Sequence, residues 1–111
     1  MIFADFYGTA WLFGAAQSAL REGIAGVFRA RLEDVVVRRI VVEGEYTATE
    51  VWIELSSDEQ LMRHGQELAR VISAVVQAQA PGEVWVLFRI VPLSHVYLNG
   101  EPRRRGSVTL E

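Results

Sequence analysis

The two halves of the chain repeat each other at a spacing of 48 to 50 residues. Leu68 follows Leu20 by 48 residues, and Val86 follows Val37 by 49. Self-similarity at one period indicates a structural unit that occurs twice, and short loop insertions produce a drift of one or two residues. The repeat therefore predicts two tandem units with the same order of helices and strands.

The first half has the pattern strand, helix, strand. The aromatic-rich segment 2–7 predicts a strand, and Thr9 is placed to cap a helix that runs to about Arg31. Residues 35–42 predict a second strand, whose nearly continuous apolar content is typical of a strand covered on both faces. The polar segment 43–50 predicts a loop or hairpin.

Three glycines, Gly14, Gly23 and Gly26, fall inside the first predicted helix. Each weakens a helix interior by up to about 1 kcal/mol. They indicate either a close approach of this helix to the sheet or a soft helix, and the sequence leaves both readings open.

The second half repeats the plan. Residues 51–55 predict a strand, and a helix begins at Ser57 or Asp58 and ends no later than Pro81. Residues 84–91 predict the last strand.

A small arm is expected after the last strand. Asn99-Gly100 is a dipeptide typical of tight hairpin turns, so residues 96–98 and the residues after Glu101 are expected to pair. The basic cluster at 103–105 is expected to be a solvated turn or a contact between subunits.

The order βαββαβ fits two architectures. In the ferredoxin-like fold the two units interlock, so the strands that flank each helix are not neighbours. In the other, each unit pairs its own strands in parallel, and near-identical halves favour this arrangement. We therefore predict an α+β fold of two tandem β-α-β units, which form a four-stranded mixed sheet with two helices on one face. The 111 residues predict a single domain, with unit one at about 1–45 and unit two at about 46–106.

The composition favours an oligomer. Half of the residues are hydrophobic, and the mean hydropathy of +0.17 is high for a small lone domain. Apolar surface that a small monomer cannot bury commonly lies in a subunit interface. No apolar run approaches the roughly 18 residues that span a bilayer, so a cytoplasmic protein without membrane contact is expected.

Charge and residue usage exclude other classes of site. The net charge of −3 and the pI of about 5.4 argue against nucleic-acid binding, which needs a basic surface. The sequence has no cysteine and two histidines, so no metal site is predicted.

Three motifs in the second half occur in a family order and spacing. They read Ser57-Asp58-Glu59-Gln60, Val84-Trp85-Val86 and Ser94-His95-Val96-Tyr97-Leu98-Asn99-Gly100-Glu101. In these motifs the chain resembles the tautomerase superfamily, which includes 4-oxalocrotonate tautomerase and macrophage migration inhibitory factor. The direct similarity covers about 45 residues, from Ser57 to Glu101.

The resemblance implies a homotrimer without a cofactor. It also implies active sites at subunit interfaces, near the chain start and the C-terminal arm. Members isomerise enolisable 2-oxo acids or related small acids, with an N-terminal proline as general base and arginines that hold the carboxylates. Here Ile2 follows Met1, and Ser56, Trp85 and Val96 stand where the family has two arginines and an aromatic residue.

Three residues are candidates for the missing base. Asp5 and Glu54 are equivalent acids on the first strands of the two units, and burial of either could make it a base. Each could instead face solvent or pair with an arginine. His95 could act as an acid or base in the arm, or be a turn histidine at the surface.

Three residues are candidates for binding a substrate. The segment 89–91 repeats 39–41, so Arg39 and Arg89 are expected in equivalent places, either as a carboxylate clamp or as salt-bridge partners. Tyr97 alternates with His95 and could face the same pocket.

Two functional hypotheses remain. The first is an isomerase or tautomerase of a small enolisable carboxylic acid, with a mechanism that does not use proline. The second is a non-catalytic trimeric binding or scaffold protein that has lost this chemistry. A dimeric ferredoxin-like enzyme or sensor is a more distant third.

Overall fold

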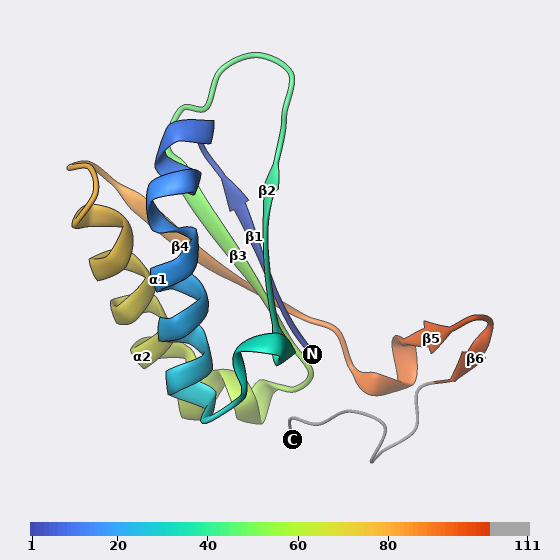
Figure 1. Cartoon of the computed structure of the whole chain (residues 1–111). Coiled ribbons are helices and arrows are strands. Elements are labelled where there is room, and N and C mark those ends of the chain that lie inside the picture. The colour runs from blue at the N-terminus through green and yellow to red at the C-terminus, as the bar shows by residue number, and fades with distance from the viewer. Residues whose placement is uncertain (103–111) are drawn as a thin grey trace.

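The computed structural model of the chain describes residues 1–102. Two short 3-10 helices, Leu32–Asp34 and Leu93–His95, accompany the main elements. The helices and strands are, in chain order, β1 (Ile2–Tyr7), α1 (Ala10–Phe28), β2 (Val35–Ile40), β3 (Thr49–Leu55), α2 (Asp58–Gln77), β4 (Val84–Ile90), β5 (Tyr97–Leu98) and β6 (Glu101–Pro102) (Figure 1).

The main sheet has the strand order β2-β1-β3-β4. Strands β1 and β2 are parallel, β3 and β4 are parallel, and β1 pairs with β3 in the antiparallel direction. Each β-α-β unit thus pairs its own strands, which excludes the interlocked ferredoxin-like order. The predicted fold class is confirmed.

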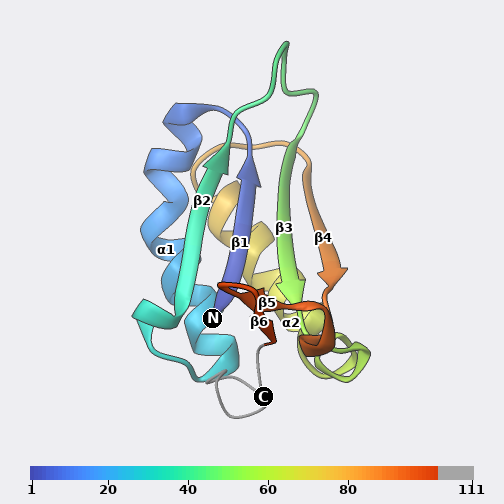
Figure 2. The same cartoon turned by 90° about the vertical axis from the view of Figure 1, so that its right-hand side faces the viewer.

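Both helices cover one face of the sheet, and the other face is open (Figures 1 and 2). Strand side chains alternate between the two faces, so every second residue of β1 and β3 enters the core. The largest fully buried side chains are Phe6, Leu20, Ile24, Val35, Val51, Ile53, Leu68, Ile72 and Val76. The open face carries the residues between them, among which Asp5 is buried and charged.

Both predicted helix caps are present. The hydroxyl oxygen of Thr9 accepts a hydrogen bond from the Leu12 amide at 3.3 Å, and that of Ser57 accepts one from the Gln60 amide at 3.2 Å. Helix α1 ends at Phe28 rather than near Arg31, because Arg29 adopts a left-handed conformation with φ of 54°. This conformation usually favours glycine, so the sequence carried no stop signal there.

The close approach marked by a glycine lies between the helices rather than between helix and sheet. A Cβ added at Gly23 would lie 2.7 Å from a side-chain carbon of Val71 on α2. At Gly14 and Gly26 a Cβ would meet nothing within 4 Å, so these two positions fit the soft-helix interpretation.

Strand β2 ends at Ile40, two residues before its predicted end, and β3 begins at Thr49, two residues before its predicted start. The predicted arm is present as β5 and β6. Asn99 and Gly100 between them have φ of 54° and 83°, as a tight hairpin turn requires. The basic cluster 103–105 lies outside the described residues. Within residues 1–102, no helix is long and apolar enough to cross a membrane.

Candidate functional site

A pocket of about 450 Å³ opens at the end of the sheet where the chain starts. We call it the Glu54 pocket, and the described residues that line it are 1–3, 28, 54–56, 60, 91, 93 and 96–98. The lining is mainly apolar. Glu54 is the acidic side chain among these residues, and none of them carries a basic side chain.

The sheet topology brings these segments together. Because β1 and β3 are antiparallel, β1 starts where β3 ends, and β4 ends there too because it is parallel to β3. The Val91 amide donates to the Leu55 carbonyl at 2.8 Å, which extends the β3–β4 pairing to the pocket. The 3-10 helix Leu93–His95 then turns the chain into the arm, which lies in front of this end of the sheet (Figure 2).

Glu54 lies on the open face of β3, with its side chain 30% exposed. The guanidinium of Arg89, its register partner on β4, donates to the Glu54 carboxylate at 3.4 Å. Arg89 also lies over the ring of Trp52, 4.9 Å from its centre. Glu54 lines the pocket, and Arg89 does not.

A polar wall stands beside Glu54. The side-chain oxygen of Gln60 accepts hydrogen bonds from the Ser56 amide at 2.8 Å and from the Ser56 hydroxyl at 2.9 Å. The contact fixes both side chains, and it occupies the hydroxyl proton of Ser56.

Aromatic side chains complete the walls. Phe3 comes from β1, Phe28 from the end of α1 and Tyr97 from the arm. Phe28 packs against His64 with ring centres 4.9 Å apart, which fixes it between the two helices. Tyr97 is exposed.

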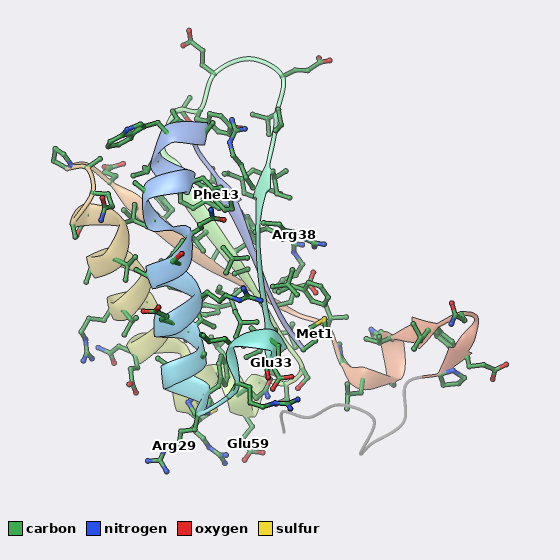
Figure 3. All side chains as sticks on the ribbon, in the orientation of Figure 1. Met1, Phe13, Arg29, Glu33, Arg38 and Glu59 are labelled. Carbon is green, nitrogen blue, oxygen red and sulfur yellow. The ribbon has the colours of Figure 1, made fainter. Side chains whose placement is uncertain are left out.

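A second acid–arginine pair lies on the open face of unit one. Arg38 donates to the two carboxylate oxygens of Asp5 at 2.6 and 3.4 Å, and it lies 5.0 Å from the ring centre of Phe3. Arg38 points away from the helices (Figure 3). The hydrogen bond that Arg38 donates to Asp5 raises the pKa of Arg38 above its ordinary value. Asp5 does not line the Glu54 pocket.

The counterpart of Arg89 in unit one is therefore Arg38, not Arg39 as the repeat suggested. Asp5 and Arg38 are register partners on β1 and β2, just as Glu54 and Arg89 are on β3 and β4. Since neighbouring strand residues point to opposite faces, Arg39 lies on the other face from Arg38.

Arg39 lies at the opposite end of the sheet from the Glu54 pocket. Its guanidinium donates to the Gly8 carbonyl at 2.9 Å and to the Tyr46 hydroxyl at 3.3 Å. Because the two units are antiparallel, the carboxyl ends of β2 and β4 lie at opposite ends of the sheet. Arg39 and Arg89 therefore do not meet within one subunit.

The remaining predicted residues divide between the arm and the pocket. His95 is exposed in the 3-10 helix of the arm and does not line the pocket. Of the six predicted site residues, the structure brings Glu54 and Tyr97 to the pocket. The sequence did not indicate Phe28, whose place depends on where α1 ends. Ser56 was noted only because it stands where the family has an arginine, and Gln60 only as part of the motif at the start of the second helix, so their hydrogen bond was not predicted. Among the described residues, no group of three potential ligands could hold a metal ion.

Known structures share this fold. A protein of unknown function from Vibrio cholerae O1 biovar eltor matches with a TM-score of 0.79 and 14% identity, over 92% of this chain and 87% of that one. A macrophage migration inhibitory factor-like protein from Entamoeba histolytica matches with a TM-score of 0.68 and 10% identity, over 92% and 98%. The F6 fused 4-OT wild type asymmetric trimer matches with 0.58 and 16%, over 90% and 94%.

No protein-family model matches the chain, and no curated protein sequence does. At these identities the structural likeness establishes the fold, which is that of the tautomerases and macrophage migration inhibitory factor.

Proposed function

Given the fold shared with a macrophage migration inhibitory factor-like protein and with fused 4-OT, we propose that this chain is an isomerase of a small carbonyl compound. The reaction takes place in the Glu54 pocket, and Glu54 is the base that moves the proton.

One observation carries the proposal: a carboxylate in the wall of a mainly apolar pocket, at the sheet end where the chain starts. A carboxylate in such surroundings can take a proton from carbon when a substrate lies within hydrogen-bond reach. Within residues 1–102, Glu54 accepts one side-chain hydrogen bond, from Arg89 at 3.4 Å, whereas a carboxylate offers about four acceptor positions.

The proton transfer conserves charge and atoms. Glu54 removes a proton from the carbon next to a carbonyl group, and the electrons of that bond form the carbon–carbon double bond. The carbonyl oxygen takes a proton from Tyr97 or from water, which gives the enol. Ser56 is not the donor, because its hydroxyl proton is held by Gln60.

The carboxylate clamp expected from the sequence is less well supported by the geometry. Arg39 lies at the far end of the sheet, and Arg89 is held by Glu54 and Trp52 outside the pocket lining. A small carboxylic acid would need Arg89 to leave Glu54, or a basic group from elsewhere.

Deuterium uptake from heavy water by phenylacetone, a neutral enolisable ketone, tests the proposal. The wild type is expected to accelerate the reaction above background, and Glu54→Gln to lower kcat/KM at least about 100-fold, which is the usual range for loss of a general base. Glu50→Gln is the matched control, because Glu50 is an equivalent acid on β3 outside this pocket. Equal rates for the wild type and both variants would contradict the proposal.

A trimer is the second part of the proposal, and a trimeric scaffold without chemistry is the alternative function. The open sheet face carries Phe3 and Trp52 between two acid–arginine pairs that neutralise their own charges. Such a face can be buried against copies of itself, and fused 4-OT is a trimer.

Light scattering is expected to give three times the 12.5 kDa of one chain. A trimer without activity favours the scaffold, whereas a monomer or dimer contradicts both functions.

A further inference from the structure

We propose that the Glu54 pocket selects its ligand by charge: it takes neutral or cationic aromatic compounds and disfavours carboxylates. The proposal names the substrate class of the proposed function and rests on the same pocket. It departs from the small acids that the sequence suggested.

The charges around the pocket set this preference. Glu54 is the charged side chain in the described lining, and no arginine or lysine lies among those residues. A ligand carboxylate in contact with Glu54 is repelled by its negative charge and a ligand ammonium group is attracted, and the neighbouring Arg89 guanidinium weakens both effects. A ligand amine or amide can also donate a hydrogen bond to Glu54, and a carboxylate cannot.

Arg89 cannot serve a carboxylate ligand without a loss elsewhere. It donates to Glu54 at 3.4 Å and lies 4.9 Å from the ring centre of Trp52. A carboxylate that drew Arg89 into the pocket would break both contacts and leave Glu54 unpaired. A neutral ligand leaves these contacts of Arg89 in place, which is why the pocket is expected to prefer it over a carboxylate.

The preference for aromatic ligands is explained by the aromatic side chains that line the pocket. Three aromatic rings line the pocket: Phe3 from β1, Phe28 from α1 and Tyr97 from the arm. Offset and edge-to-face ring contacts favour an aromatic body over a chain of similar area. A volume of about 450 Å³ holds a molecule with one substituted ring.

Three probes with one ring and different charges test the selection. Phenethylamine is cationic, phenylacetamide is neutral and phenylacetate is anionic at neutral pH. NMR titration of the full chain is expected to give the tightest Kd for phenethylamine, and a Kd for phenylacetate at least about tenfold weaker. The resonances of Phe28 and Tyr97 are expected to shift.

Glu54→Gln keeps the shape and removes the charge, so the three Kd values are expected to come within about threefold of each other. Glu50→Gln is expected to keep the wild-type order. The titration is repeated with the Met1 amine acetylated, because that amine would oppose the preference. Tightest binding of phenylacetate, or an order that Glu54→Gln leaves unchanged, overturns the inference.

The binding titrations and the isomerisation assay test the charge selection and the proposed catalysis separately. The expected order of Kd without any isomerisation overturns only the proposed catalysis. Isomerisation that depends on Glu54, together with tightest binding of phenylacetate, overturns only the charge selection.

Discussion

Arg89 donates to Glu54 across the β3–β4 pair, in the same register relationship that joins Arg38 to Asp5 across β1 and β2. The two pairs differ in what surrounds them. The Asp5 side chain is 8% exposed and receives two hydrogen bonds, whereas that of Glu54 is 30% exposed and faces a pocket. Duplication therefore left one pair that stabilises the sheet and one pair whose acid is accessible to a ligand.

The Asp5–Arg38 pair predicts a loss of stability on mutation. Arg38→Met keeps the apolar stem but leaves the buried Asp5 carboxylate unpaired. We expect the free energy of unfolding to fall by about 2 kcal/mol, less than the roughly 3–5 kcal/mol of a fully buried pair, because Arg38 is half-exposed. Urea denaturation monitored by Trp fluorescence measures it.

Two further variants separate charge from packing. Asp5→Val combined with Arg38→Met removes both charges and is expected to recover part of the lost stability. Arg89→Met in the more exposed pair is expected to cost less than about 1 kcal/mol. A loss for Arg89→Met as large as for Arg38→Met would show that the two pairs are not distinguished by burial.

The glycines of α1 predict opposite outcomes for one substitution. Gly26→Ala adds a methyl group in open space and is expected to raise the free energy of unfolding by about 0.5–1 kcal/mol through helix propensity. Gly23→Ala places the same methyl 2.7 Å from Val71, whose β-branched side chain has few alternative rotamers, so the gain is expected to be lost or reversed. Thermal unfolding of the two variants measures the difference, and equal stabilisation would refute the close helix contact.

The Arg31–Asp34 pair predicts a dependence of stability on pH. The hydrogen bond from Arg31 lowers the pKa of Asp34 below its ordinary value of 3.8. A carboxyl with a lowered folded-state pKa contributes stability that is fully present above 3.8 and is lost as the pH falls through the folded-state pKa.

Asp34→Asn removes this contribution. We expect its Tm to lie below that of the wild type at about pH 7, and the two Tm values to converge at about pH 2. A difference in Tm that stays constant over this range would mean that the charge of Asp34 is not involved.

The repeat predicted the topology because each half must pair its own strands, and the Asn99-Gly100 turn predicted the arm. The same repeat misaligned the arginines. Its offset drifts with short insertions, and a slip of one residue in a strand moves a side chain to the other face. Arg39 was thus paired with Arg89, although Arg38 is the true counterpart.

The pocket was harder to foresee than the fold. Phe28 reaches it only because α1 stops at a left-handed Arg29 without a glycine. Glu54 was one of three possible bases, and no local pattern distinguishes it from Asp5. The difference lies in the neighbours: two hydrogen bonds from Arg38 cover Asp5, while Glu54 stands at the strand end beside the arm.

Deuterium exchange at the benzylic carbon of phenylacetone in heavy water tests the role of Glu54 most directly. This neutral ketone carries one ring and needs no carboxylate clamp, so exchange reports proton removal from carbon alone. NMR is expected to show exchange by the wild type and by Glu50→Gln well above the rate without protein. Glu54→Gln is expected to lower the rate at least about 100-fold. Exchange by Glu54→Gln at the wild-type rate would contradict the assignment of Glu54 as the base.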